Sequence, residues 1–131
     1  MGAAFGETAE VIAETARSVV TIERDPERVA AARARVAGLD NVEVVEVDVY
    51  EVLRERGPFE LVFVDGGRPF DWEPIVAAVA PGGLLVKDDL TPGLPIEGDE
   101  IREFLLRDAR LAAAEILVTP DEAVIVAVRL R

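Results

Sequence analysis

Residues 18–36 read SVVTIERDPERVAAARARV, a short β-branched run followed directly by a helix-forming segment. The run over 18–23 predicts a strand, because compact β-branched stretches of this length favour extended structure. Asp25 can accept hydrogen bonds as the N-cap of a helix, and Pro26 suits the first helical position. The stretch therefore predicts a strand, a tight turn and a helix that runs to about Val36.

The same alternation of strand and helix continues on both sides of this unit. We expect further helices over 6–17, 48–56, 72–80 and 99–108, further strands over 42–47, 60–64 and 84–87, and a closing pair of strands over 113–118 and 123–130. Repeated strand–helix units give parallel strands with helices on both faces, and a short connection makes the last two strands an antiparallel hairpin. The sequence predicts a single doubly wound α/β domain over residues 1–131.

Composition narrows the chemistry that this domain could perform. The chain has 131 residues with no Cys and no His, so disulfides and thiolate metal sites are excluded. Histidine is both the commonest general base and the commonest metal ligand in proteins, so its absence removes both options. Any metal would have to be held by oxygen atoms, which favours Mg²⁺, Ca²⁺ or Mn²⁺.

Charge and hydropathy point to partners and location. The net charge of −12 argues against a nucleic-acid partner, because such binding depends on Lys and Arg neutralising phosphates. No apolar run approaches the ~20 residues of a membrane helix, and the N-terminal residues do not resemble a secretory signal. We therefore expect a cytoplasmic protein that binds neither nucleic acid nor membrane.

Acidic residues follow every predicted parallel strand. Glu23, Asp48, Asp65 and the pair Asp88-Asp89 each come directly after an apolar run. Ligands of parallel α/β sheets bind beyond the carboxyl ends of the strands, so these side chains are candidates for a binding site. Each of them could instead cap a helix or a turn, and Asp48 could do both.

The N-terminal residues Gly2-Ala3-Ala4-Phe5-Gly6 stand directly before a predicted helix. Small residues let backbone N–H groups approach a ligand closely, and a helix start favours an anionic group. A loop that needs glycine only to turn would look the same.

With these residues in view, the chain resembles the class I S-adenosylmethionine-dependent methyltransferases. Gly2 to Thr8 is similar to their glycine-rich loop, and Glu23 follows at the end of the next strand. The resemblance extends over essentially the whole chain and implies a three-layer, Rossmann-like fold that binds S-adenosylmethionine. It implies that the methionine end lies at Gly2, Ala4 and Gly6, the ribose at Glu23, the adenine at Asp48 and Val49, and the methyl donor beside Asp65.

A narrower resemblance is to the catechol-type O-methyltransferases. In that group a divalent cation, usually Mg²⁺, is held by an acid after the fourth strand and a pair after the fifth, which implies a metal site at Asp65, Asp88 and Asp89. Where those enzymes place a lysine base, this chain has Arg68, which stays protonated and is suited to orienting an anionic substrate. The alternative is that these acidic residues line the edge of the sheet without binding a metal ion.

The first strand of the family fold, which lies centrally in the sheet, has no counterpart here. Met1 stands where that strand should end, so the resemblance is to an N-terminally truncated domain. The strands at 18–23 and 60–64 lose the neighbour between them and need another partner for their backbone groups. They could pair directly, or a second chain could fill the gap, for example in a homodimer.

The resemblance implies methyl transfer from S-adenosylmethionine, and we expect a small-molecule oxygen as acceptor. Two alternatives remain open at this point. The chain could be a catalytically incomplete binding or scaffold domain, or it could bind NAD, because an acid at the position of Glu23 is shared with that class. The glycine spacing and the terminal hairpin favour the methyltransferase.

Overall fold

A computed structural model describes residues 5–66 and 70–131 of the chain. They fall into two compact units, Met1–Val52 and Leu53–Arg131, each of which is described by itself below. A single domain over 1–131 stays a prediction.

The first unit holds two parallel strands and their helices. Its elements are α1 (Glu7–Ala13), β1 (Val19–Ile22), α2 (Pro26–Arg35), β2 (Val42–Val45) and the start of α3 (Val49–Arg56). The strands pair in register from Val19 opposite Val42 to Ile22 opposite Val45. Each of these elements lies within a range predicted from the sequence.

The start of α2 follows the predicted capping chemistry. The Asp25 carboxylate accepts hydrogen bonds from the backbone N–H groups of Glu27 and Arg28 at 2.9 and 3.1 Å. Pro26 occupies the first helical position, where its missing N–H costs nothing. Helix α2 therefore begins where the sequence places it.

Helix α1 is shorter than the predicted 6–17, and the reason lies in a long-range contact. The Asn41 side chain donates to the carbonyl oxygens of Ala13 and Ala16 at 2.9 and 3.0 Å. These bonds satisfy carbonyl groups at the end of α1 that continuation of the helix would otherwise have used. Periodicity alone does not reveal such a partner.

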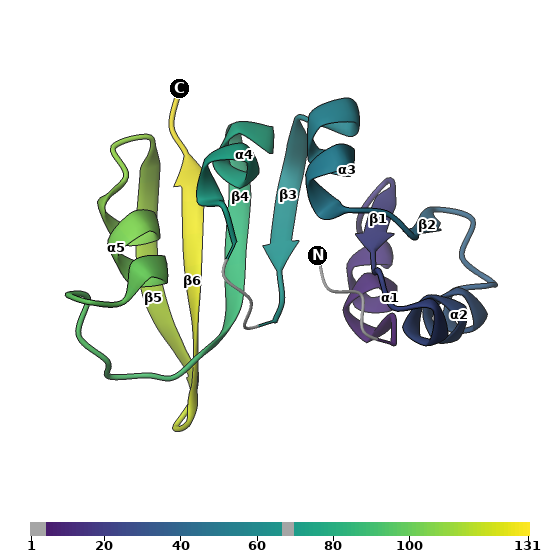
Figure 1. Ribbon diagram of the computed structural model, residues 1–131, viewed down its shortest axis with the longest axis horizontal. Helices are drawn as coiled ribbons and strands as arrows, with labels where there is room; N and C mark the ends of the chain where they lie inside the picture. The colour runs from purple at the N-terminus through teal and green to yellow at the C-terminus, as the bar shows by residue number, and fades with distance from the viewer. Residues whose placement is uncertain (1–4, 67–69) are drawn as a thin grey trace. The chain divides into compact units, whose positions relative to one another are not determined.

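The second unit is built on a four-stranded sheet of order β3-β4-β6-β5 (Figure 1). Its elements after α3 are β3 (Phe59–Val64), α4 (Trp72–Ala78), β4 (Val79–Leu90), α5 (Glu100–Arg107), β5 (Leu111–Thr119) and β6 (Glu122–Arg129). Strand β3 pairs with β4 in parallel, and β6 pairs antiparallel with both β4 and β5. The predicted hairpin at the end of the chain is confirmed. Strands β1 and β3 belong to different units, so the alternatives of direct pairing or of a second chain between them stay predictions.

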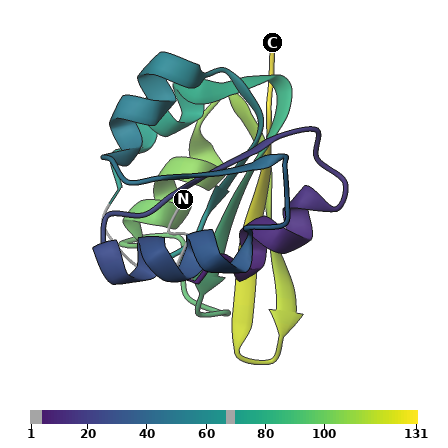
Figure 2. The same cartoon turned by 90° about the vertical axis from the view of Figure 1, so that its right-hand side faces the viewer.

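Both α4 and α5 lie on the same side of this sheet (Figure 2). Helix α4 packs against β3 and β4, and α5 packs against β5. The core of the unit comprises fully buried residues of the helices and of the covered face, among them Ile75, Leu105, Leu85, Ile125 and Ala127.

Strand β4 is much longer than the predicted 84–87. It includes the Pro81-Gly82-Gly83 stretch, where the register against β3 shifts between Phe59 and Leu61. A Cβ on Gly83 would lie 2.9 Å from the carbonyl oxygens of Ala80 and Glu60, so the irregular strand depends on glycine there. At its other end β4 continues to Leu90 and therefore contains both Asp88 and Asp89.

Among the described residues, no helix combines the length and the apolar character that crossing a bilayer requires.

Candidate functional site

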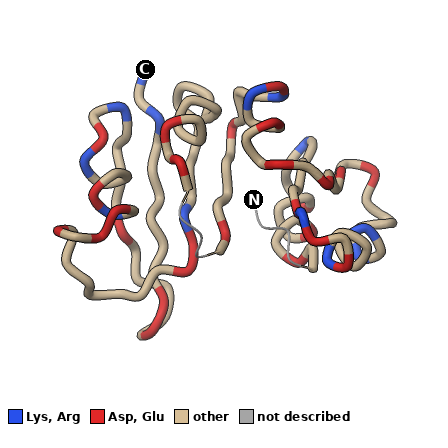
Figure 3. Tube along the Cα trace, in the orientation of Figure 1, with Lys and Arg blue, Asp and Glu red and all other residues tan. Residues whose placement is uncertain are grey.

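Charged side chains lie mainly on helices and in loops, and the middles of strands β3, β4 and β6 carry few of them (Figure 3). The candidate residues are therefore found at strand ends, where the sequence predicts them. Each unit presents one group of them.

In the first unit, Glu23 follows β1 and is only 9% exposed. Its Oε1 atom accepts hydrogen bonds from the backbone N–H groups of Arg24 and Asp25 at 2.7 and 3.1 Å. The backbone N–H of Glu23 donates to Val45 of β2 at 3.1 Å. The carboxylate is thereby held in a defined position at the carboxyl end of the two strands.

Asp48 follows β2 and therefore belongs to the same edge of the parallel pair. Its Oδ1 atom accepts from the backbone N–H of Tyr50 at 2.9 Å, so the residue also holds the start of α3. Its Oδ2 atom lies 3.5 Å from Nη1 of Arg24, the residue after Glu23. Val49 is the half-buried first residue of α3. The first unit thus places Glu23 and Asp48 at the same edge of the strand pair, where Asp48 pairs with Arg24. Asp48 caps α3 and remains a candidate for ligand binding as well.

Gly6 precedes α1 with φ = +85°, a conformation that L side chains rarely adopt. A Cβ at this position would lie 3.3 Å from Cα of Ala32 in α2. The glycine therefore serves both the turn and a close approach to α2. Gly2 and Ala4, predicted to face the methionine end, lie outside the described residues.

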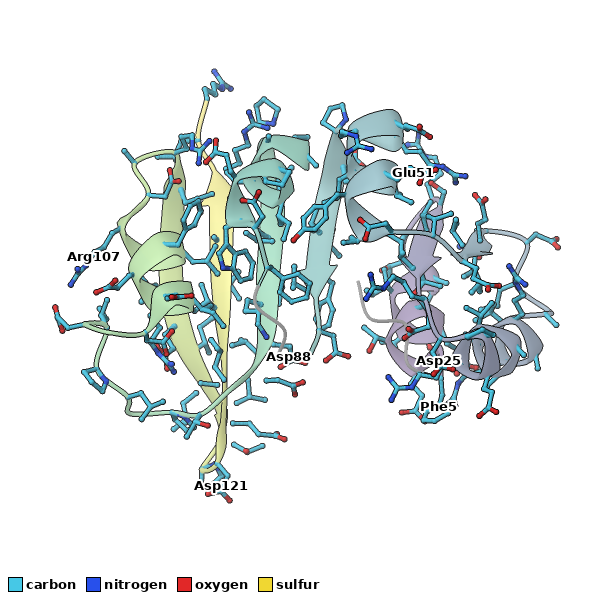
Figure 4. All side chains as sticks on the ribbon, viewed as in Figure 1. Phe5, Asp25, Glu51, Asp88, Arg107 and Asp121 are labelled. Carbon is cyan, nitrogen blue, oxygen red and sulfur yellow. The ribbon has the colours of Figure 1, made fainter. Side chains whose placement is uncertain are left out.

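In the second unit, Asp65 follows β3, and Lys87, Asp88 and Asp89 lie near the end of β4 (Figure 4 labels Asp88). The parallel register pairs Val64 with Lys87, which places Asp65 beside the acidic end of β4. Burial raises the pKa of the Asp65 carboxyl, as do a hydrogen bond with Asp89 and the charges of Asp89 and Asp88. The neutral form of the Asp65 carboxyl is therefore favoured relative to that of an ordinary aspartate.

Lys87 is 1% exposed and is the cation of this cluster. Its Nζ atom donates to the backbone carbonyl of Asp88. Burial lowers the pKa of the lysine, whereas the charges of Asp89, Asp65 and Asp88 oppose that shift. Lys87 is not among the site residues predicted from the sequence, although a lysine at the end of an apolar run, directly before two acids, was an available signal.

Asp89 has φ = 60°, in the left-handed region that is unusual for a residue with a side chain. Its backbone N–H donates to Oδ1 of Asp88 at 2.9 Å, a local bond that supports this conformation. The two neighbouring acids therefore play different parts: Asp88 supports the turn, and Asp89 bonds to Asp65.

The predicted Mg²⁺ site is not supported. Within residues 5–66 and 70–131, no group of three or more acidic, His or Cys side chains is arranged to hold a metal ion. The physical reason is visible at Asp65, Asp88 and Asp89: two of the three share a hydrogen bond, and Lys87 supplies the positive charge. Arg68 lies outside the described residues, so its role stays a prediction.

Arg102 is a second buried cation that sequence reasoning missed. It donates to both carboxylate oxygens of Glu115 at 2.7 Å, to Asp99 at 2.5 Å and to the carbonyl oxygen of Thr91 at 2.7 Å. These bonds join α5 to β5 and to the start of the irregular loop after β4. The hydrogen bonds with Glu115 raise the pKa of Arg102, so it is a permanent structural cation.

Comparison of the sequence with protein-family models finds no match. Among curated proteins, the chain is 30% identical over 102 residues to a protein-L-isoaspartate O-methyltransferase of Pyrococcus abyssi, covering 76% of this chain and 44% of that protein. It is 36% identical over 108 residues to a protein of the same name from Methanoregula boonei, covering 81% and 46%. The chain thus spans about half the length of these relatives.

Solved structures show the same class of fold. An rRNA methylase from Streptococcus thermophilus superimposes with a TM-score of 0.78 at 17% identity, over 98% of this chain and 83% of that one. A methyltransferase from Podospora anserina with bound S-adenosylhomocysteine gives a TM-score of 0.71 at 21% identity, over 99% and 69%. The predicted Rossmann-like fold with a C-terminal antiparallel hairpin is confirmed.

These likenesses correct two expectations. The relatives carry the name of a protein-L-isoaspartate enzyme, so the narrower resemblance to catechol-type enzymes is not what they show. The expectation of a small-molecule substrate and no nucleic acid is contradicted by that name and by an rRNA methylase among the structural neighbours. Net charge misled here, because it describes the chain as a whole and not the surface that receives a substrate. The chain has the fold of the class I S-adenosylmethionine-dependent methyltransferases, and the curated proteins it matches are protein-L-isoaspartate O-methyltransferases.

Proposed function

We propose that this chain binds S-adenosylmethionine and supports methyl transfer to a carboxylate oxygen of a protein substrate. The observation that carries the proposal is the fixed, buried carboxylate of Glu23 at the carboxyl end of two parallel strands, an edge at which Asp48 pairs with Arg24. The acceptor class is taken from the name of the curated relatives.

The residues of the first unit suit an adenosyl group. Hydrogen bonds within the described residues engage Oε1 of Glu23, so Oε2 is available for a ribose hydroxyl. Asp48 is about half exposed, and its neighbour Val49 offers an apolar contact for adenine. Gly2, Ala4 and Gly6 would hold the methionine end, where small side chains let the backbone come close.

A carboxylate acceptor is compatible with the lack of histidine and cysteine in the chain. S-adenosylmethionine, when bound, would supply an activated methyl group. Transfer of that methyl group to a carboxylate oxygen would give a methyl ester and S-adenosylhomocysteine, with the electron pair of the broken C–S bond left on sulfur. A carboxylate is already deprotonated at neutral pH, so no base has to take a proton. A chain without histidine or cysteine can therefore support the reaction through orientation and proximity.

The second unit would position the acceptor. Asp65, Asp88 and Asp89 would line the reaction centre, with Lys87 moderating their negative charge. Arg68 would orient the incoming carboxylate, since a guanidinium binds a carboxylate in a bidentate manner. No step needs a metal ion.

Calorimetric titration with S-adenosylhomocysteine tests the binding half of the proposal. We expect saturable binding, no comparable heat with NAD, and a loss of about 10-fold or more in affinity for Glu23→Gln, as for a lost charge-assisted hydrogen bond. Glu27→Gln is the matched control, because Glu27 is exposed on the next turn. Binding of NAD alone, or equal affinity in both variants, would reject the proposed site.

Transfer of labelled methyl groups tests the acceptor. An isoaspartyl peptide should be methylated in preference to the aspartyl peptide of the same sequence, and the product should be base-labile, as methyl esters are. Saturable cofactor binding without any transfer would instead favour a binding or scaffold role.

A further inference from the structure

Strand β5 forms one edge of the four-stranded sheet, because within the described residues it pairs with β6 alone (Figure 1). Edge strands present unpaired backbone N–H and C=O groups, and proteins commonly protect them with Lys, Pro or short length. Strand β5 has nine residues, LAAAEILVT, and contains no Lys, Arg or Pro. This edge therefore lacks the usual protection against pairing with another chain.

The register against β6 shows which backbone groups of β5 point outward. The N–H of Leu130 donates to the carbonyl oxygen of Arg110 at 2.7 Å, so the backbone groups of Arg110 face β6. In an antiparallel ladder every second residue bonds to the partner strand, and the register stays regular over 111–117. The residues whose N–H and C=O groups face away from β6 are therefore the odd-numbered ones, Ala113, Glu115 and Leu117.

Helix α5 covers only the first half of β5. Its third residue, Arg102, bonds to Glu115 in the middle of the strand, and the end of the helix lies beside Leu111. The next three residues after Glu115 are 48%, 63% and 59% exposed: Ile116, Leu117 and Val118. Successive side chains of a strand point to opposite faces, so both faces of this second half are apolar and exposed.

The irregular loop after β4 forms a groove with the second half of β5. The groove has a volume of about 590 Å³, and it is lined mainly by apolar residues of the loop and the hairpin: Pro92, Leu94, Leu117, Pro120 and Ala123. Glu115 also borders the groove, but Arg102 donates to both of its carboxylate oxygens. The groove is therefore suited to an apolar side chain of a segment that lies along β5.

The groove is level with the carboxyl end of β4. Leu90 of β4 pairs with Ala123 of β6, and Ala123 pairs with Leu117 of β5. With neighbouring strands about 4.8 Å apart, a chain added outside β5 would lie about 14 Å from β4, which four or five extended residues span. A protein segment that pairs with β5 could therefore keep another of its residues at the acidic edge beside Asp65.

We propose that β5 binds an extended apolar segment of the acceptor protein, which adds to the sheet as a further strand and places one apolar side chain in the groove. The identity of the partner rests on the proposed function, because that function makes the acceptor a protein. In this mode of recognition the main-chain hydrogen bonds supply affinity, and a pocket for a side chain supplies preference.

A second copy of the chain is the competing occupant of this edge. Two chains that each carry a net charge of −12 repel one another, which disfavours self-association. The position of the groove level with the end of β4 favours the acceptor as well, since a second copy would gain nothing from that position.

N-methylated peptides test strand addition on the unchanged chain. The probe is a labelled, capped octapeptide of alternating Val and Thr with one central Leu, and its binding is followed by fluorescence anisotropy. Two further probes carry N-methyl groups on the odd-numbered or on the even-numbered residues. Only one set of N–H groups would face β5, so one N-methylated probe should bind at least 10-fold more weakly and the other should match the parent probe. Equal affinity of all three, or equal loss in both, would overturn strand addition.

Variants of the chain separate the strand edge from the groove. Ala113→Pro removes an outward-facing N–H and keeps the ladder to β6, so it should weaken probe binding at least 10-fold. Leu117→Ser shortens one wall of the groove and should weaken binding at least 5-fold. Val11→Ser is the matched control, because Val11 is 65% exposed on α1 of the first unit, and it should leave binding unchanged. An equal loss in Val11→Ser would contradict the assigned surface.

Circular dichroism and thermal unfolding check that each variant is folded, and the N-methylated probes give an answer that depends on no variant. Sedimentation of the unchanged chain tests the competing occupant. A stable dimer that Ala113→Pro dissolves would overturn the proposal, since the edge would then belong to a second copy.

Isoaspartyl peptides test the identity of the partner. An apolar segment four or five residues from the isoaspartyl residue, on one of its two sides, should lower KM at least 5-fold relative to a polar peptide of equal length, with kcat unchanged. Leu117→Ser should remove this difference in KM. Transfer at equal KM would overturn the assignment of the acceptor to β5. Binding of the octapeptide without transfer to any isoaspartyl peptide would refute the proposed function and the identity of the partner, and would support strand addition alone.

Discussion

Lys87 shows how much a single side chain can change the meaning of an acidic cluster. Three carboxylates at a sheet edge suggest a cation site, and the structure places a buried ammonium group among them. Burial, together with Asp89 and Asp88, nevertheless raises the pKa of the Asp65 carboxyl. Lys87 therefore offsets part of the negative charge of the cluster from within the chain.

The raised pKa of Asp65 makes stability depend on pH. Because burial favours the neutral form in the folded state, its stabilising effect is complete below the unfolded pKa near 3.8 and is lost as pH rises through the higher folded pKa. Asp65→Asn stays neutral, so it should unfold at a temperature higher by about 2 °C at pH 7 and equal to the parent at pH 3.

Thermal unfolding from pH 3 to 7 measures this difference. Asp121→Asn, at the exposed tip of the hairpin, is the control and should match the parent throughout (Figure 4). A lower melting temperature of Asp65→Asn at pH 7 would contradict the assignment of burial as the dominant cause.

The buried ion pairs of Arg102 lead to a second prediction about a single residue. Arg102→Met leaves Glu115 and Asp99, each about four-fifths buried, without their cation, so unfolding free energy should fall by about 3 kcal/mol. Arg107→Met removes an exposed ion pair with Glu97, so its effect on the unfolding free energy should be much smaller. Urea unfolding measures both, and equal losses would contradict the role given to burial.

At the scale of elements, local chemistry sets where helices begin and long-range contacts set where they end. Asp25 starts α2 through bonds to its own first turn. The end of α1 depends instead on Asn41, 25 residues or more along the chain. Likewise β4 passes through Pro81-Gly82-Gly83 because its partner strand tolerates a shift of register.

The cap of α2 can be tested directly. Asp25→Ala removes two hydrogen bonds to the first turn and should lower the unfolding free energy by about 1 kcal/mol. Asp40→Ala, on an exposed turn, should change it by less than about 0.5 kcal/mol. Chemical denaturation compares the two; an effect at Asp40 as large as at Asp25 would show that loss of charge, and not capping, is responsible.

At the scale of the whole molecule, the two units differ in how their strands are supported. The first has a two-stranded sheet, whereas β4 and β6 of the second are each paired on both sides. Two strands alone are marginally stable, because few hydrogen bonds and little apolar surface are shared.

Hydrogen exchange should report this difference. Amides of β4 and β6 should exchange more slowly than those of β1 and β2, since the latter open in smaller, less costly events. Addition of S-adenosylhomocysteine should slow exchange in β1 and β2, as a ligand stabilises the state that binds it. Faster exchange in β4 than in β1 would contradict the first expectation, and unchanged exchange on adding the ligand would argue against cofactor binding there.

Much of this organisation could be predicted from the sequence alone. Strand and helix order, the cap at Asp25, the terminal hairpin and the acids at strand ends all follow from residues close together in the chain. These features depend on local backbone preference and hydrophobic periodicity, which a sequence displays directly. The convergence of both acidic groups on one cofactor stays a prediction.

Only the tertiary structure identified the buried cations Lys87 and Arg102 and the early end of α1. Each depends on which distant segments meet: a lysine reads as a surface residue until strands bury it, and an alternating strand does not reveal which of its faces the helices will cover. The order of residues along the chain determined the helices and strands. Packing between distant elements decided which charged side chains are buried, where helices end and which face of a strand is covered.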